Sequence, residues 1–485
     1  MKILVLNAGS SSQKSCLYEI TGDRLPDRPP EPLWEATVDW THKQGFAEIK
    51  VKTVAGKVLA DIFQSYDLDG DGFVSREEWM GTDAIFDAID IDRDGKISPT
   101  EMGAGLGAIL QMAKEEIPTQ SRPKVITHLL ETLWQGKAAV IGHPSEINAV
   151  GHRVVHGGQE YSETMRVTDE VKSAIARLSA LAPVHNPANL EGIEAVESIL
   201  GTEVPQFAVF DTAFHSHLPD AAAIYPSPYS WVELGIRRYG FHGISHQYCA
   251  HRTAKLLNRD LQDLRLIICH LGNGCSLSAV RNGHSVDTTM GFTPLDGLMM
   301  GSRSGSVDPG ILIHLLRQEG YTADRLDREL NKESGLKGIS GVSADLRQIV
   351  AAIEAGNPRA QLALNIYIHR LRSCIGSMLA SLGGLDALVF TAGVGENSAI
   401  VRSLACQAFE FLGLKLDEQQ NGSHPVDRDV ATADSKVPVL VIHTQENWEI
   451  ARDCYRLFHG SGQNSPNELV LEVPLVDSDL RSRTC

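Results

Sequence analysis

Two segments far apart in the chain share one pattern: a short apolar run, a turn of small polar residues and a second apolar run. The first is KILVLNAGSSSQKSCLY at residues 2–18, and the second is LIICHLGNGCSLSAV at residues 266–280. Each predicts two strands joined by a glycine- or serine-rich turn. Because the unit occurs twice, we expect two domains of related architecture that face one cleft.

The stretches between these units favour an α/β fold. Residues 385–402 run from an apolar strand through a glycine-rich turn into a helix start, where backbone N–H groups can bind an anion or a nucleotide. Residues 169–181 and 358–382 carry apolar side chains at helical spacing. Residues 461–485 are polar and predict a loosely held tail. Strands alternating with helices indicate an α/β protein.

Composition excludes several classes of protein. The 485-residue chain is 42% hydrophobic, enough for two cores, and no apolar run is long enough for a bilayer. A net charge of −17 argues against nucleic acid and anionic membranes as partners. The eight cysteines are scattered without a CxxC pair, which is typical of the reducing cytoplasm. We expect a cytoplasmic protein.

Four segments carry groups suited to phosphate chemistry. The turn NAGSSSQK at residues 7–14 offers small residues and Lys14 to phosphate oxygens, although alone it equally fits an ordinary polar hairpin. Arg153 and Arg303 each lie beside glycine-rich backbone, and two guanidinium groups suit the charge of a transferring phosphoryl group. Asp211 ends an apolar strand, a common position for a functional carboxylate in α/β folds.

An acidic segment needs its own explanation. Residues 57–102 hold 12 Asp or Glu against four Lys or Arg. Within it, residues 67–78 and 90–101 both fit the twelve-residue calcium loop, with Gly72 and Gly95 at the sharp bend. A merely solvated acidic loop would not place glycine correctly twice. The predicted Ca²⁺ ligands are Asp67, Asp69, Asp71, Phe73 and Glu78, then Asp90, Asp92, Asp94, Lys96 and Glu101.

The two loops start 23 residues apart, which leaves one shared helix where two are common, so their pairing stays open. Calcium either regulates the rest of the chain or only folds a peripheral module. We favour the second interpretation.

At the phosphate-binding segments the chain closely resembles the acetate kinase family, within the superfamily of sugar kinases, actin and heat-shock chaperones. The resemblance spans about residues 1–50 and 125–460, and LVLNAGSSSQK and LIICHLGNGCSLSAV are its diagnostic stretches. It implies two duplicated actin-like ATPase domains around a cleft. The implied domains are residues 1–56 with 118–213, closed by 447–460; a helical EF-hand insertion at 57–117; a nucleotide-binding domain at 214–446; and the tail at 461–485.

The family further implies a homodimer that transfers a phosphoryl group reversibly between ATP and acetate, giving acetyl phosphate and ADP, with Mg²⁺ or Mn²⁺. It implies that Asn7 and Glu446 hold the metal. The catalytic residues it implies are Arg153, His185, Asp211, His242 and Arg303. The nucleotide contacts it implies are Ser12, Lys14, His270, Leu271, Gly272, Asn273, Gly274, Asp345, Leu346, Arg347, Gly393, Val394, Gly395, Glu396 and Asn397.

The implied apolar pocket for the carboxylate is Val155, Val184, Phe241 and Pro294, with Arg153 beside it. Relatives usually have Leu at position 184, Thr at position 244 and TNEE where this chain has TQEN at 444–447. Val184 leaves room for one methylene, so we expect acetate to be preferred and propionate accepted. A propionate or butyrate kinase, and a calcium-responsive binding protein with a vestigial site, are the alternatives.

Acetate is already ionised at neutral pH, so transfer to it needs little proton chemistry. We therefore expect direct in-line transfer without a covalent enzyme intermediate, with Asp211 as a positioning group rather than a general base.

Overall fold

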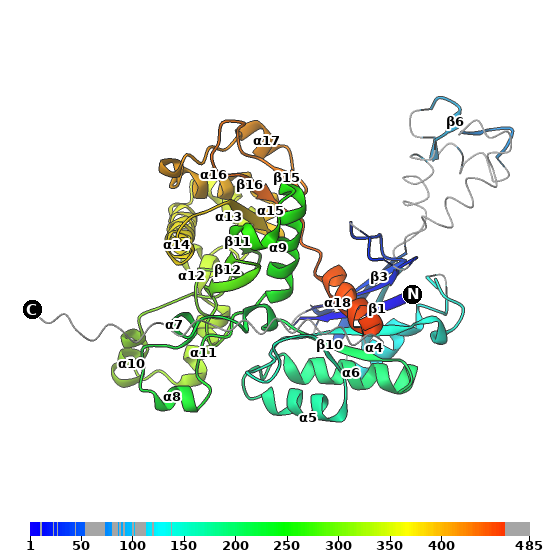
Figure 1. Ribbon diagram of the computed structural model, residues 1–485, viewed down its shortest axis with the longest axis horizontal. Coiled ribbons are helices and arrows are strands. Elements are labelled where there is room, and N and C mark those ends of the chain that lie inside the picture. Colours follow the sequence, from blue (N-terminus) through cyan, green and yellow to red (C-terminus); the bar gives the residue numbers. More distant parts are fainter. Residues whose placement is uncertain are drawn as a thin grey trace, which may run out of the picture.

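The computed structural model of the chain describes residues 1–9, 12–22, 24–26, 28–43, 45–53, 73–79, 86, 89–90, 93–98, 101, 113–118, 121–136 and 138–460. These residues form two α/β domains, and the chain crosses between them twice, after strand β10 and again just before helix α18 (Figure 1).

The first domain is built on an eight-stranded sheet in the order β7-β4-β3-β2-β1-β8-β10-β9. β1 and β2 form the predicted hairpin, with Asn7 opposite Lys14. β8 and then β10 continue the sheet parallel to β1. The strands are β1 (Lys2–Ala8), β2 (Ser12–Glu19), β3 (Trp34–Lys43), β4 (Phe46–Thr53), β7 (Ala113–Pro118), β8 (Ala149–Val154), β9 (Met165–Arg166) and β10 (Gln206–Phe210).

The second domain repeats this arrangement in a six-stranded sheet, β13-β12-β11-β14-β16-β15. β11 and β12 are an antiparallel hairpin, and β14 and β16 continue it parallel to β11. The expectation of two related domains is therefore confirmed. The strands are β11 (Arg265–Leu271), β12 (Cys275–Arg281), β13 (His284–Thr288), β14 (Ala387–Thr391), β15 (Arg428–Asp429) and β16 (Val439–Val441).

Alternating side chains of β1 face two different sets of helices. Leu4 and Leu6 pack with α4 (Arg122–Glu131) and α6 (Asn186–Leu200), and α5 (Asp169–Leu178) packs beside α6. Ile3 and Val5 face α18 (Glu446–Gly460) on the other side of the sheet. The last helix of the described chain thus closes the first domain.

One hydrophobic core joins the two domains. It contains β1 and β10 of the first sheet, β11 and β14 of the second, and the helices α9 (Gly243–Leu257) and α18 between them. Figure 1 shows this helix pair at the middle of the molecule. The other helices are α7 (Asp220–Ala223), α8 (Ser230–Glu233), α10 (Pro309–Gln318), α11 (Ala323–Lys332), α12 (Gly335–Ser340), α13 (Leu346–Glu354), α14 (Pro358–Leu382), α15 (Ala392–Asn397), α16 (Ala399–Gln407) and α17 (Glu418–Gly422).

Helix α14 has the bounds that its sequence predicts. The side chain of Asn357 accepts the N–H groups of Arg359 and Ala360, and Pro358 occupies the first turn, where its missing N–H costs nothing. The helix ends at Gly383, whose φ of 66° is left-handed and suits glycine. Its apolar face covers β11 and β12 in the main core of the second domain.

The acidic segment joins the first sheet at its edge. It leaves the sheet after β4 and returns to it through β7, which pairs antiparallel with β4. Within it, β5 (Val74–Ser75) pairs with β6 (Lys96–Ile97), and a small separate core contains Val74, Phe86, Ile89 and Ile97. Strand β6 lies apart from both sheets (Figure 1).

The packing of α18 on the first sheet generates a stability prediction. A Cβ atom added at Gly151 of β8 would lie 2.6 Å from both Sγ of Cys454 and Cγ2 of Ile450. Gly151→Ala should therefore lower the free energy of unfolding by about 1–3 kcal/mol, because α18 must shift. Urea unfolding followed by circular dichroism measures the change.

Gly376→Ala is the matched control, because an added Cβ there meets no atom of the described chain within 4 Å. This helical position should gain about 0.5–1 kcal/mol from the substitution. If Gly151→Ala is as stable as the unmodified chain, the close packing of α18 on β8 is wrong.

Candidate active site

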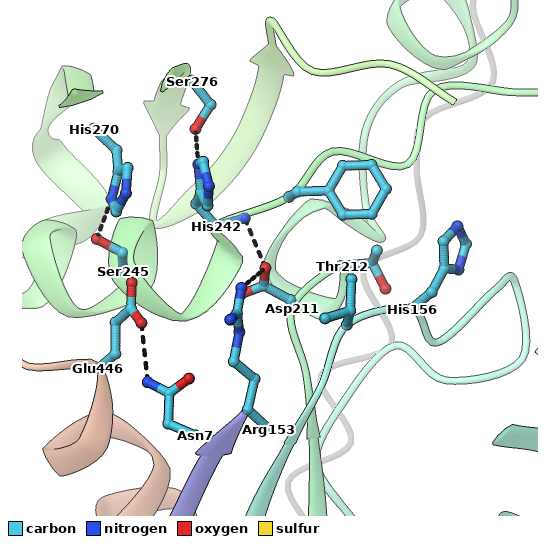
Figure 2. A network of polar contacts seen from close by, with 12 residues as sticks. Asn7, Arg153, His156, Asp211, Thr212, His242, Ser245, His270, Ser276 and Glu446 are labelled. Atoms are coloured by element: carbon cyan, nitrogen blue, oxygen red, sulfur yellow. Dashed lines mark hydrogen bonds and ion pairs between the residues drawn. The ribbon is translucent and has the colours of Figure 1, made fainter. Parts of the chain in front are cut away.

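Asp211 directly follows β10 and is the centre of a polar network at the junction of the domains (Figure 2). Its Oδ2 atom accepts hydrogen bonds from Nη2 of Arg153 at 2.8 Å and from the backbone N–H of His242 at 3.0 Å. Its carbonyl oxygen accepts the N–H of Gly243 at 2.9 Å. A side chain at position 243 would collide with that carbonyl, so the turn into α9 requires glycine.

Arg153 lies on β8 with its guanidinium held in the network. Burial would lower its pKa, but the carboxylates of Asp211 and Glu446 outweigh burial and raise the pKa above its ordinary value. Its Nε atom is buried and has no hydrogen-bond partner in the described part of the chain. Because buried N–H groups are rarely left unpaired, this atom suits an oxygen of a bound anion.

Arg303 approaches the same place from the second domain. Its Nη1 atom donates to the carbonyl oxygen of Pro294 at 3.3 Å, and no ion pair joins it to a carboxylate among the described residues. A Cβ atom at Gly274 would lie 3.2 Å from Nη1 of Arg303 and 3.4 Å from Nε2 of His242. Burial lowers the pKa of Arg303. The two predicted arginines thus flank His242 from different domains.

The imidazoles of the site are neutral. Burial lowers the pKa of His242 well below its ordinary value and also lowers that of His270, and the two rings stack with centroids 4.1 Å apart. The pKa of His185, which precedes α6, falls to about 4 through burial and the charges of Arg153 and Arg303. These rings can donate or accept hydrogen bonds without adding positive charge.

Asn7 and Glu446 come together from opposite ends of the chain. Nδ2 of Asn7 donates to Oε2 of Glu446 at 3.1 Å and to Oδ1 of Asn447 at 2.9 Å. A carboxylate beside an amide suits Mg²⁺, which typically takes one or two carboxylates and completes its shell with phosphate and water oxygens. No group of three or more acidic, histidine or cysteine ligands occurs in the described ranges. A metal here would depend on oxygens of its substrate.

The four residues of the expected carboxylate pocket differ in burial. Val155 and Phe241 are buried, and the ring of His156 meets that of Phe241 edge-on at 5.6 Å. Pro294 is half-buried beside Arg303. Val184 is 65% exposed, so in this arrangement of the domains it does not enclose the pocket.

A cavity of about 1080 Å³ opens in the second domain beside the turn after β11. Eight of the expected nucleotide contacts line it: Gly272, Asn273, Asp345, Leu346, Arg347, Gly393, Val394 and Asn397. The lining residues that sequence reasoning missed are Ser343, Ala344, Val350, Ser398, Ala399, Ile400 and His424. Ala344 and Ser398 directly adjoin expected contacts and could have been found from the sequence, but His424 carries no sequence signal.

The other seven expected nucleotide contacts do not line this cavity. Ser12 and Lys14 are on β2, His270 and Leu271 end β11, and Gly274 faces His242. Gly395 is buried in α15. The carboxylate of Glu396 accepts the N–H groups of Ala392 and Thr444 and pairs with His443, so it braces the chain just before α18.

The two loops expected to bind calcium are described in part. Oε2 of Glu78 accepts the N–H and hydroxyl of Ser75, and Oε2 of Glu101 accepts the same groups of Ser98. The carboxylate of Asp90 accepts the N–H groups of Asp94 and Gly95, and Asp94 accepts that of Lys96. The ring of Phe73 lies 5.4 Å from Nζ of Lys96. The expected ligands outside the described residues are Asp67, Asp69, Asp71 and Asp92.

The family model of the Acetokinase family matches residues 98–452. The chain belongs to the acetokinase family. Two further matches, at residues 59–81 and 82–106, are to the EF-hand model, so the acidic segment is similar to EF-hands. The expected family and the EF-hand character of the insertion are confirmed.

Curated relatives and solved structures extend this result. The chain is 60% identical over 464 residues to the acetate kinase of Cyanothece sp., covering 96% of this chain and 100% of the relative. The crystal structure of Porphyromonas gingivalis acetate kinase matches with a TM-score of 0.77 and 35% identity, over 94% of this chain and 99% of that one. A propionate kinase from Francisella tularensis matches with a TM-score of 0.73 and 33% identity, over 93% and 98%.

These relatives confirm the expected fold, two actin-like domains with the EF-hand region in the first, and an enzyme of the acetokinase family. None of the helices described is both long enough and apolar enough to cross a membrane.

Proposed function

We propose that this acetokinase is an acetate kinase, which transfers a phosphoryl group reversibly between ATP and acetate to give ADP and acetyl phosphate. The observation that carries the proposal is the approach of Arg153 and Arg303 to His242 from different domains, with Asp211 bonded to both Arg153 and His242. Two guanidinium groups and neutral imidazoles suit the negative charge that spreads over a transferring phosphoryl group.

In this proposal a carboxylate oxygen of acetate attacks the terminal phosphorus of ATP. An O–P bond to the acyl group forms while the bond to the bridging oxygen breaks, and ADP leaves in line. Nε of Arg153, buried and unpaired within the described chain, donates its N–H to an oxygen of acetate or of the phosphoryl group. Asn7 and Glu446 would hold Mg²⁺, which would supply positive charge beside the phosphate oxygens. Nucleotide occupies the cavity beside Gly272 and Asn397.

Asp211 acts by position in this scheme. Its carboxylate already binds Arg153 and the N–H of His242, and acetate carries no proton to remove. Its role is to aim the guanidinium and to hold the start of α9. Direct transfer without a covalent enzyme intermediate follows from the same reasoning.

A hydroxamate assay with acetate, ATP and Mg²⁺ tests the activity. Arg303→Ala should lower kcat by about 100-fold to 1000-fold, the range expected for removing one preorganised charge-stabilising donor. Arg281→Ala, which changes an exposed arginine of the same domain, is the control and should keep the rate. Acetate should give a higher kcat/KM than propionate, by about 10-fold to 200-fold.

Each alternative has its own result in this assay. Equal kcat/KM values for acetate and propionate would contradict the preference for acetate. A higher kcat/KM for propionate would favour a propionate kinase. The exposure of Val184 and the match to the Francisella propionate kinase support that alternative. No hydroxamate with either acid would leave a calcium-responsive binding protein with a vestigial site.

We propose in addition that the insertion binds Ca²⁺ and that calcium folds it without controlling the kinase. The EF-hand matches and the position of Glu78 and Glu101 at equivalent turns support binding. The paired strands β5 and β6 support two loops that act as one unit. Its attachment through β4 and β7, at the edge of the sheet opposite β9, separates it by β3, β2 and β1 from the strands β8 and β10 that position Arg153 and Asp211, which supports independence from the site.

Calorimetric titration of metal-free protein should therefore detect Ca²⁺ binding that Glu101→Gln weakens at least about tenfold. Glu77→Gln, an exposed neighbour of Glu78, is the control and should bind normally. Kinase turnover at saturating Mg²⁺ should be equal in chelator and in micromolar calcium. A calcium-dependent turnover would show that the insertion is regulatory.

The homodimer that the resemblance implies is supported by helix α10. None of its side chains is buried by the described chain, although it carries Ile311, Ile313 and Leu316, which are 44–50% exposed. A helix that is apolar on more than one side is normally covered. We propose that a second copy of the chain covers this helix. We also propose a cytoplasmic location, because the seven cysteines described are all free thiols and a reducing compartment keeps thiols free.

Sedimentation equilibrium should give twice the chain mass for the unmodified protein. The double variant Ile311→Glu, Ile313→Glu should shift the equilibrium to the monomer, because burying two carboxylates disfavours association. Arg317→Glu, on the same helix, is the control. A monomer at micromolar concentration for the unmodified chain would overturn the proposal.

A further inference from the structure

Ser276 lies between two histidines of the second domain. Its hydroxyl is 2.9 Å from Nδ1 of His242 and 2.7 Å from Nε2 of His246 (Figure 2 shows the first contact). Ser276 and His246 are completely buried, and they come from different elements, β12 and α9. The three side chains form one hydrogen-bonded chain that ends in the active site.

Both histidines of this chain are neutral, because burial lowers the pKa of His242 and of His246 well below the ordinary value. A neutral imidazole has one N–H donor and one bare nitrogen. The serine hydroxyl has a single proton and two lone pairs, and among the described residues its oxygen has hydrogen-bond contacts with these two rings alone, so its proton goes to one ring and it accepts from the other. Only two arrangements of the three protons are therefore consistent with both contacts.

The surroundings of His246 distinguish these arrangements. Its Nδ1 atom is buried and has no hydrogen-bond partner within the described ranges. If the serine donated to His246, Nδ1 would carry the proton, and a buried N–H would be left unpaired. If His246 donates to the serine, Nδ1 is a bare acceptor, and an unpaired acceptor is the more tolerable of the two. The favoured order is His246 Nε2–H to Ser276, and Ser276 O–H to Nδ1 of His242.

This order leaves the proton of His242 on Nε2, the nitrogen that faces the active site. A Cβ at Gly274 would lie 3.4 Å from Nε2 of His242 and 3.2 Å from Nη1 of Arg303, so both groups approach the same glycine. His270 is arranged in parallel, with Nδ1 on the hydroxyl of Ser245 at 2.8 Å and Nε2 near Gly272. The bare backbone of this turn gives both rings access to a ligand.

We propose that Ser276, oriented by His246, is a positioning residue that holds His242 in the tautomer with a proton on Nε2, so that the ring donates a hydrogen bond to the transferring phosphoryl group. The proposal rests on phosphoryl transfer as the proposed function. In the other tautomer, Nε2 would present a lone pair to an anion and repel it. The hydroxyl of Ser276 thus determines whether Nε2 of His242 attracts or repels the phosphoryl group.

Kinetics of two variants test the role of the hydroxyl. Ser276→Ala should lower kcat by about tenfold and change KM for acetate and ATP by less than about twofold, because the donor acts on the transition state. Ser278→Ala is the matched control: it removes a buried hydroxyl two residues along β12 that bonds Ser285 instead. It should keep kcat within about twofold. Equal losses in both variants would mean a structural effect and would overturn the proposal.

Variants at position 246 test whether His246 acts by donating a hydrogen bond to Ser276 or only by filling space. Glutamine carries an amide N–H that can replace Nε2 of histidine, whereas leucine fills space without a donor. His246→Gln should retain kcat, and His246→Leu should lose as much as Ser276→Ala. If leucine is tolerated as well as glutamine, His246 does not orient the serine.

A spectroscopic measurement keeps the inference testable even if a variant fails to fold. Nitrogen-15 spectra of the histidine-labelled unmodified protein distinguish the protonated from the bare nitrogen of each ring. The resonance of His242 should report a proton on Nε2, and a proton on Nδ1 would overturn the tautomer. This result does not depend on turnover, whereas an inactive unmodified protein with the expected tautomer would instead overturn the proposed function.

Discussion

The contact between Asp211 and Arg153 is the constraint on which the rest of the site depends. Both side chains lie in the interior, and a buried charge without its partner costs about 3–5 kcal/mol. The pair therefore fixes the end of β10 against β8. Because the same aspartate also bonds the backbone of His242 and Gly243, it fixes where α9 begins. One carboxylate thus sets the relation between the first sheet and the helix that opens the second domain.

The packing of α18 on the first domain also positions side chains of the site. Glu446 begins a helix whose apolar face packs on β1 and β8, and this packing brings its carboxylate to the Asn7 amide at the end of β1. Hydrophobic burial between the two ends of the chain therefore assembles the pair that we propose as the metal ligands. Glu396 braces the approach to this helix by accepting the N–H of Thr444. The position of the Glu446 carboxylate therefore depends on the apolar packing of α18.

Local patterns in the sequence were sufficient for the hairpins, for α14 and for the carboxylate after β10, because each depends on neighbours in the chain. The chain of His246, Ser276 and His242 was not predictable as a unit: the two histidines share the start of α9, but Ser276 comes from β12, and no spacing in the sequence connects it to them. The position of Val184 in the fold was not predictable from the sequence either. Its family position implied a pocket, but its exposure depends on how the two domains are arranged.

The insertion shows how a second module can be added without disturbing this arrangement. It enters and leaves through β4 and β7 at the edge of the sheet, where no other described strand must be displaced, and Val74, Phe86, Ile89 and Ile97 form its own core. A signal from the loops to the site would have to move β7 along β4. A slip of one residue would turn Ile117, which packs against the core, to the other face of the sheet. The register that keeps Ile117 inside therefore resists such a movement, and the calcium-driven folding that we propose for the module can leave in place the strands that carry Asn7 and Arg153 and the strand that precedes Asp211.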